Sequence, residues 1–160
     1  MKSWTWMIVV ATSFLAGTLP TLAVPYYLND AYVPGGDVYT TAQGNNDNNG
    51  QTPSTPKAHL TNLTATVSLA PGDVVYIDTG TYAPATIGSA VVGAAGTNIV
   101  FQGSTNLAAG GTAFSGGENN LTVAGRYLSL RDIFLVGGTR GLKLNSTATY
   151  NDFERIIAVT

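Results

Sequence analysis

After Pro71 the chain is a series of short apolar runs separated by small and polar residues. The runs are rich in β-branched or aromatic side chains, whereas Gly, Asn, Ser and Thr lie between them. Runs of this length and composition are typical of strands and are too short to indicate helices. We therefore expect strands at residues 74–77, 98–101, 121–123, 127–130, 133–136, 142–144 and 153–159.

These runs recur at nearly constant spacing. Three pairs of segments align with each other, namely 130–133 with 153–156, 120–123 with 141–144, and 74–76 with 99–101. The period is about 21 to 25 residues, and one solenoid coil of three short strands and three turns needs about that many. The repetition therefore favours a β-solenoid over a sandwich.

The chain before Pro71 has a different pattern. Residues 26–28 and 37–41 read as two short strands separated by a turn at 34–36. Residues 43–53 are rich in Asn and Gly, which tolerate turn conformations, and are predicted to form a loop.

A short amphipathic helix is predicted after this loop. Thr55 is the expected N-cap and Pro56 the expected first helical residue. The helix should end before Pro71, because the residue preceding a proline avoids helical geometry. One stripe of this helix would cover the end of the solenoid core, and its residues are Leu60, Leu63 and Val67.

The strand pattern continues to the last residue, Thr160. A terminal solenoid coil exposes its apolar interior and its strand edges. We therefore expect this chain to be the leading part of a longer protein or a truncated gene product, with the remaining coils beyond Thr160 as its partner. The alternative is a dimer partner that covers the open end.

Residues 1–23 have the pattern of a secretory signal peptide. Lys2 supplies a positive start, residues 7–15 are mostly apolar, and residues 21–23 form a small-residue cleavage site. The apolar run is too short to cross a bilayer as a helix. The alternative is an uncleaved anchor, and Pro20 just before the site favours cleavage after Ala23. The predicted location is secreted or cell-surface, with the periplasm as a further destination.

Charge and cysteine content narrow the partners. The chain has a net charge of −2, and loss of residues 1–23, which contain one lysine, makes it −3. This balance gives no electrostatic footprint for nucleic acid or for an anionic membrane surface. No second apolar run is long enough to span a membrane, and no cysteine is present, so the exported protein must be stabilised by packing alone.

Two segments together carry a family resemblance. The polar stretch GNNDNNGQTPSTPK at residues 44–57 is followed by PGDVVYIDTGTY at residues 71–82. This order of polar loop, short helix and Pro-Gly-Asp turn into a strand resembles the N-terminal region of secreted right-handed parallel β-helix proteins of the pectate-lyase-like superfamily. The resemblance covers about residues 26–82.

The resemblance implies an all-β fold, a right-handed parallel β-helix with a short capping helix. The implied organisation is a signal peptide at 1–23, N-terminal strands, loop and capping helix at 24–72, and the first coils at 73–160. It also implies action on, or binding of, polysaccharide, with calcium-dependent lyase chemistry. The active site would then lie on coils outside this sequence. The competing hypothesis is a non-catalytic cell-surface or adhesion scaffold.

The loop contains a candidate calcium site. Asn45, Asp47 and Asn49 alternate before Gly50, as oxygen ligands do at the start of a calcium loop. Two departures weaken the match: the first ligand is not Asp, and the twelfth position is Pro56 where a bidentate Glu is expected. The alternative is a polar connection that uses Asn and Gly for their turn geometry.

Arg131 and Asp132 form the candidate carbohydrate-binding site. Glu154 and Arg155 follow at the same place one repeat later, so stacking should place Arg131 over Glu154 and Asp132 over Arg155. This arrangement predicts either an outer ladder of ion pairs or the edge of a groove for an anionic sugar, since Arg forks suit carboxylates.

Other candidates have simpler interpretations. Asp73 and Asp78 flank one predicted strand and are interpreted as turn formers rather than as a glycosidase pair. His59, the single histidine, lies in the predicted helix, which disfavours a histidine-based nucleophilic site. The eight tyrosines are expected to be strand residues or platforms for sugar rings. The catalytic residues themselves stay unknown at this level.

Overall fold

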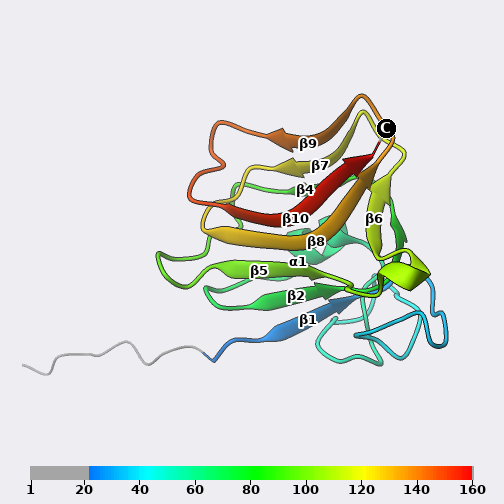
Figure 1. Cartoon of the computed structure of the whole chain (residues 1–160). Helices are drawn as coiled ribbons and strands as arrows, with labels where there is room; N and C mark the ends of the chain where they lie inside the picture. The colour runs from blue at the N-terminus through cyan, green and yellow to red at the C-terminus, as the bar shows by residue number, and fades with distance from the viewer. Residues whose placement is uncertain (1–21, 160) are drawn as a thin grey trace, which may run out of the picture.

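The computed structural model describes residues 22–159, and these residues are dominated by parallel strands (Figure 1). The predicted signal peptide at 1–23 lies almost entirely outside the described part. The elements, in chain order, are β1 Pro25–Leu28, α1 Leu60–Thr66, β2 Val74–Ile77, β3 Gly80–Tyr82, β4 Ala85–Ile87, β5 Ile99–Gly103, the 3₁₀ turn η1 Leu107–Ala109, β6 Thr112–Ser115, β7 Asn119–Val123, β8 Leu128–Val136, β9 Arg140–Leu144 and β10 Asp152–Val159.

Two parallel sheets make up the fold. The larger sheet has the order β1-β2-β5-β8-β6-β3, with β10 also paired to β8, and the smaller sheet has the order β4-β7-β9. Figure 1 shows β1, β2, β5, β8 and β10 lying one above the other, with β4, β7 and β9 on the opposite side. The chain is therefore all-β with one short helix, as predicted at the level of fold class.

The long strand β8 pairs with two different neighbours along its length. Its first half is in register with β5 and its second half with β6. The change occurs at Asp132, which has a left-handed φ of 56°. β10 repeats this bend at Arg155, with φ of 52°. Each of these strands thus contributes to two arms of the larger sheet.

The observed registers test the three predicted alignments. Phe153 pairs with Leu130 and Leu142 pairs with Leu121, which confirms the first two alignments. The third alignment was wrong by one position, because Val74 pairs with Val100 rather than with the residue before it. Both segments begin with two consecutive apolar residues, so the apolar pattern alone did not fix which one faces the core. A slip of one position would turn each side chain to the other face.

The core lies between the two sheets and is built from stacked inward-facing residues. Val75, Phe101 and Leu130 occupy equivalent positions on neighbouring strands and are fully buried. Leu121 and Val123 of β7 are buried in the same cluster from the smaller sheet. Burial of each such side chain contributes about 1.5–3 kcal/mol, so these repeated stacks dominate stability.

The helix has the predicted apolar stripe but a different start. Leu60 and Leu63 are buried, and Val67 packs partly buried against the core just after the helix ends at Thr66. The predicted start at Thr55–Pro56 was wrong, and the N-cap is His59. The reason is that Lys57 is in extended backbone pairing with β1: its N–H donates to the Tyr27 carbonyl at 2.9 Å, and its carbonyl accepts from Asn29 at 3.0 Å.

The predicted strand at 37–41 was also wrong. The backbone N–H groups of Val38, Tyr39 and Thr40 all donate to the carboxylate of Asp78, at 2.7, 2.9 and 2.7 Å. Successive N–H groups of a strand point in opposite directions, so three of them cannot converge on one side chain in strand geometry. The loop predicted at 43–53 is confirmed as non-regular backbone.

Candidate functional site

Outward-facing side chains of five neighbouring strands form one continuous row on the larger sheet. Inward neighbours such as Val75 and Leu130 are fully buried, whereas the row residues are partly or largely exposed. The pairing registers place the row residues opposite one another from strand to strand. We call this set the outer row, and its residues are Tyr27, Tyr76, Gln102, Arg131 and Glu154.

One end of the outer row is aromatic. The rings of Tyr27 and Tyr76 stack with centroids 5.6 Å apart, and the ring of Tyr39 lies 4.9 Å from that of Tyr76. The Tyr39 hydroxyl donates to the Gly103 carbonyl at 3.1 Å, which fixes this ring beside the row. Burial, and then the nearby carboxylates of Asp132 and Asp78, raise the pKa of Tyr39, so it stays a neutral hydroxyl.

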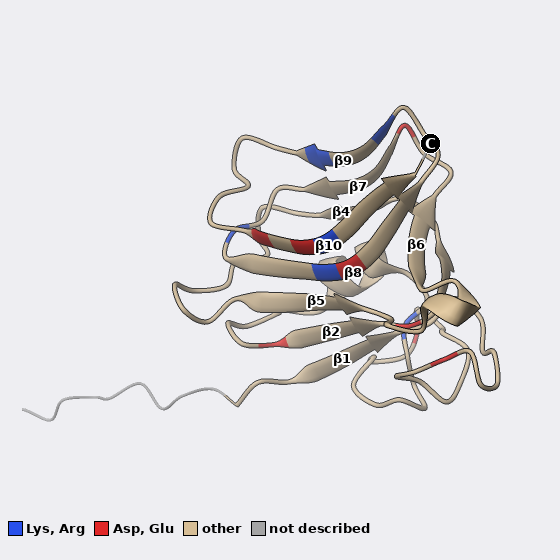
Figure 2. Cartoon of the chain, viewed as in Figure 1, with Lys and Arg blue, Asp and Glu red and all other residues tan. Residues whose placement is uncertain are grey.

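The other end of the outer row is charged. Arg131 lies 3.5 Å from Glu154, and Arg155 donates to both carboxylate oxygens of Asp132, at 2.5 and 2.8 Å. Arg155 also contacts Glu154. Figure 2 shows the charged positions of β8 and β10 lying next to each other. The predicted stacking of Arg131 over Glu154 and of Asp132 over Arg155 is therefore confirmed.

Asp132 of β8 is hydrogen-bonded by side chains of both neighbouring strands, β5 and β10. Its side chain is only 8% exposed, and Gln102 donates to it at 2.7 Å. The hydrogen bonds from Arg155 lower the pKa of Asp132, with burial opposing the shift and the Gln102 hydrogen bond adding to it. The same contact raises the pKa of Arg155. The pair is thus held in its ionised form. The Arg131 side chain is 43% exposed, and its contact with Glu154 is longer, at 3.5 Å, than the contacts of Arg155 with Asp132.

Gly103 is required where β5 passes the bend of β8. A Cβ at this position would come within 2.0 Å of the Asp132 carbonyl oxygen, which is backbone and cannot move aside. Gly103 therefore permits the close approach of the two strands that places Gln102 against Asp132.

A hollow of about 450 Å³ adjoins Arg131 on the same face of the sheet. Asn98 donates to Asp152 across it at 3.0 Å. Its lining is mostly polar and extends the surface of the outer row toward the start of β5, β8 and β10; the residues are Gly96, Thr97, Asn98, Val100, Ser129, Arg131 and Asp152.

The three residues of the candidate calcium site do not converge. Asn45 and Asp47 border a shallow hollow that does not include Asn49. The Asn45 Oδ1 atom accepts from the Asp47 N–H at 3.0 Å, and the Asn49 Oδ1 atom accepts from the Gln51 N–H at 3.0 Å. These side-chain oxygens therefore serve local turns, and one carboxylate is a weak donor set for calcium. The residues fit the ion poorly, and calcium binding at this loop stays a prediction.

The carboxylates of Asp73 and Asp78 are used by the fold. Asp73 accepts from the N–H groups of Val24 and Ala70, both at 2.8 Å, which closes the turn before β2. Asp78 is fully buried, and besides residues 38–40 it accepts from the Thr79 N–H at 2.8 Å and the Thr40 hydroxyl at 2.7 Å. Asp73 is the predicted turn former, whereas Asp78 anchors a loop that lies far earlier in the chain.

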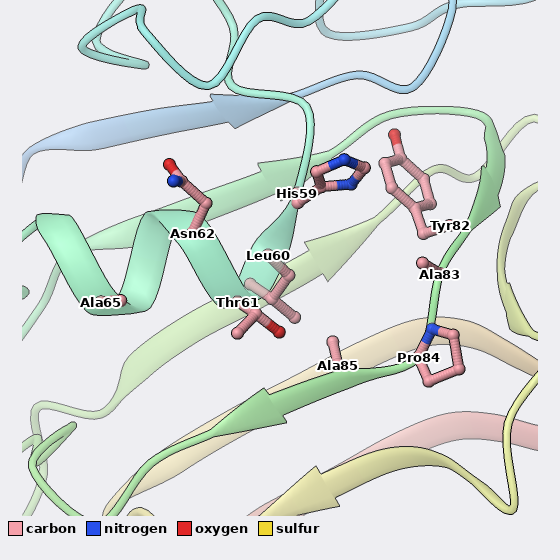
Figure 3. Close-up of a pocket in the computed structure, with 9 residues that line it drawn as sticks. All are labelled: His59, Leu60, Thr61, Asn62, Ala65, Tyr82, Ala83, Pro84 and Ala85. Atoms are coloured by element: carbon pink, nitrogen blue, oxygen red, sulfur yellow. The ribbon is translucent and has the colours of Figure 1, made fainter.

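A second pocket, of about 490 Å³, lies between α1 and the segment that joins β3 to β4. Figure 3 shows the His59 ring beside the Tyr82 ring, with Ala83, Pro84 and Ala85 continuing from Tyr82 along the segment that faces α1. The Tyr82 hydroxyl donates to the Asp78 carbonyl at 3.1 Å, and burial raises its pKa strongly. Because its walls are mainly apolar and include one histidine, this pocket suits binding by shape complementarity rather than acid–base catalysis.

Comparisons with protein-family models, with curated proteins and with solved structures gave no match. Across residues 22–159, no helix is long and apolar enough to cross a membrane.

The sequence identified the residues of the charged end of the site. It predicted sugar-binding tyrosines only as a group, without showing which of them come together. Arg131 and Asp132 were found because their partners recur at the same place in the next repeat. Tyr39 and Gln102 have no such repeat, and they reach Tyr76 and Asp132 only through the fold. The available signal was Gly103 after an apolar run, since a glycine at a strand end indicates a close backbone approach.

Proposed function

We propose that this chain is an exported right-handed parallel β-helix that binds polysaccharide along the outer row. Three observations support the architecture. All named strand pairs are parallel, the strands recur in threes as β2-β3-β4 and β5-β6-β7, and the residues of the outer row pair directly with one another from strand to strand. Right-handed crossovers are the rule for parallel connections.

The outer row is the observation that carries the binding proposal. Neighbouring strands lie about 4.8 Å apart, so a row across five strands is about 19 Å long and matches an extended chain of several sugar rings. Tyr27, Tyr39 and Tyr76 offer ring faces for the apolar faces of sugars. Arg131 offers donors for carboxylate groups. The Gln102 amide oxygen offers an acceptor for hydroxyl groups, because its NH₂ group already donates to Gly103 and Asp132.

The geometry supports binding better than catalysis by these residues. Both arginines at the charged end are engaged by carboxylates, and proton abstraction by Arg would need a guanidinium whose pKa is lowered. Lyase chemistry therefore stays the further expectation from the family resemblance. If it occurs, we propose that its reacting groups are not the Asp132–Arg155 pair.

The proposal is tested by polymer binding. Full-length protein is run in affinity electrophoresis through pectin, alginate, xylan and a neutral glucan, beside Tyr76→Ala, Arg131→Ala and the control Thr122→Ala on the outward face of β7. Loss of the Tyr76 ring should weaken binding about three- to ten-fold, the value of an aromatic contact. Thr122→Ala should leave retention unchanged.

Two results would redirect the proposal. Equal retention of all variants would place binding away from the outer row. Failure of the wild-type protein to bind any polymer would favour the scaffold hypothesis, in which the row serves only the fold. Release of unsaturated sugars, followed by ultraviolet absorbance with calcium and with chelator, tests the lyase expectation separately.

A further inference from the structure

The three turns that lead from the smaller sheet back to the larger sheet lie side by side at one corner of the fold. They follow β4, β7 and β9, and together they line a pocket of about 360 Å³. The lining contains one cation, four hydroxyl groups and no carboxylate; its residues are Ser89, Arg126, Ser146, Thr147 and Thr149. Such a composition suits an anionic group.

Arg126 differs from the other arginines of the described chain. Arg131, Arg140 and Arg155 each form an ion pair with a carboxylate, whereas Arg126 has no carboxylate within 4.0 Å among residues 22–159. Its guanidinium is therefore available for a ligand, and a free guanidinium is the side chain best suited to a bidentate carboxylate or sulfate.

The backbone of Arg126 is held on both sides. Its N–H donates to the Val91 carbonyl at 3.3 Å, and its carbonyl accepts from the Gly93 N–H at 3.0 Å. The third turn is attached as well, because the Thr147 hydroxyl donates to the Ala124 carbonyl at 2.7 Å and Asn151 donates to the Gly125 carbonyl at 2.9 Å. The pocket is thus built on fixed backbone, which lowers the entropy cost of binding.

A pair of stacked tyrosines lies next to the pocket residues in the chain. Tyr127 and Tyr150 each directly follow a lining residue, and their rings stack with centroids 4.8 Å apart and planes 10° from parallel. Tyr150 is 71% exposed, so the outer face of this stack is open to a ligand. The Tyr127 N–H donates to the Thr149 carbonyl at 3.2 Å, which ties the stacked tyrosines to the pocket wall.

We infer that this corner binds an acidic sugar: Arg126 and the surrounding hydroxyls hold its carboxylate, and the sugar ring packs on Tyr150. The inference goes beyond the outer row, because it uses other residues at another corner of the fold. It does not depend on the proposed polymer binding, and either can fail alone.

The test compares two small sugars that differ only at C6, which is a carboxylate in one and a neutral hydroxymethyl group in the other. Methyl β-glucuronide and methyl β-glucoside are titrated into the isotope-labelled full-length protein, with inorganic sulfate as a third probe. The glucuronide should shift the Arg126 Nε–H and Tyr150 ring signals, and the glucoside should bind at least about ten-fold more weakly, as expected for loss of a charged hydrogen-bond pair.

Variants separate the two parts of the site. Arg126→Ala should weaken glucuronide binding about ten-fold or more, and Arg126→Lys should give an intermediate loss, because Lys keeps the charge but not the fork. Arg140→Ala, which removes an exposed arginine paired with Glu118, is the matched control and should have no effect. Tyr150→Ala should weaken glucuronide about three- to ten-fold and leave sulfate unchanged.

Several results would overturn the inference. They are the absence of glucuronide binding, equal affinity for glucuronide and glucoside, equal losses for the Arg126 and Arg140 variants, and an unchanged affinity in Tyr150→Ala. Melting temperatures of all variants establish whether a loss of binding reflects the site or the fold. Weaker binding by an Arg126→Ala variant that melts as the wild type supports the site. Partial recovery of binding in Arg126→Lys supports it again. If Arg126→Ala unfolds, the Arg126→Lys and Tyr150→Ala results decide.

Discussion

The guanidinium of Arg155 donates two hydrogen bonds to the carboxylate of Asp132, which lies one repeat earlier in the chain. The two residues occupy the same bend on neighbouring strands, and both have left-handed backbone. This contact connects the charged end of the outer row to the turn that redirects β8 and β10 from one arm of the sheet to the other.

Asp132→Asn should make stability less sensitive to acid. Because Arg155 lowers the pKa of Asp132 in the folded state, the unfolded chain binds a proton more readily than the folded chain. The resulting stabilisation is present above the unfolded-state pKa of about 3.9 and is lost as the pH falls through the lower folded-state pKa. Melting temperatures of wild type and variant should differ most above about pH 5 and converge toward about pH 2. A difference that is constant over this range would contradict the prediction.

Asp78→Asn should destabilise the protein strongly. The buried carboxylate accepts three backbone N–H groups of residues 38–40, the Thr79 N–H and the Thr40 hydroxyl. An amide replaces one acceptor oxygen by a donor and leaves buried N–H groups unsatisfied, at a cost of about 2–4 kcal/mol. Urea unfolding measures this loss. Asp47→Asn, in the exposed loop, is the control and should change stability by less than about 0.5 kcal/mol.

Leu63→Asp should remove much of the stability that the helix provides. Leu63 is fully buried against the core, so the variant loses apolar burial and places a carboxylate where no partner exists for it. We expect a loss of about 3 kcal/mol or more by urea unfolding. Ala65→Asp, an exposed position on the same helix, should be mild. Similar unfolding midpoints for the two variants would show that α1 does not seal the core.

Gly103→Ala should disturb both the fold and the outer row. The added methyl group would meet the Asp132 carbonyl oxygen, and overpacking of this kind costs about 1–3 kcal/mol. The matched control is Gly88→Ala, where no atom lies within 4 Å of the added carbon. Thermal unfolding should separate the two variants, and an equal effect would place the close contact of β5 and β8 in doubt.

The predictable part of the fold is the part whose pattern repeats. The strands around Leu130 and Phe153 were predicted because inward positions must be apolar in each of them, and the contact of Asp132 with Arg155 followed from the same spacing. The register of β2 on β5 was not predictable to the residue, because Val74 and Val75 are both apolar and only burial in the fold distinguishes them.

The unpredicted part depends on single side chains that override local pattern. The β-branched and aromatic side chains of residues 38–41 favour a strand, but the carboxylate of Asp78 binds the N–H groups of residues 38–40 and holds this segment as a loop. The cap preference of Thr55 favours an earlier helix start, but pairing of Lys57 with β1 keeps that backbone extended. Contacts between residues this far apart along the chain leave no signal in a local window of sequence. For the same reason the contacts of Tyr39 with Tyr76 and of Gln102 with Asp132 were not predicted.

Among residues 22–159, the non-glycine residues with left-handed φ form two couples, Tyr127 with Tyr150 and Asp132 with Arg155. Each position carries a backbone strain of about 1–2 kcal/mol that glycine would avoid. In each couple the strained residues contact each other, through stacked rings or through an ion pair. Replacing one member by glycine would relax one backbone while leaving the other strained and without its partner. The effects of two substitutions within one couple on the free energy of unfolding should therefore be non-additive. We expect a substitution at one residue of a couple to be tolerated better when its partner is replaced as well.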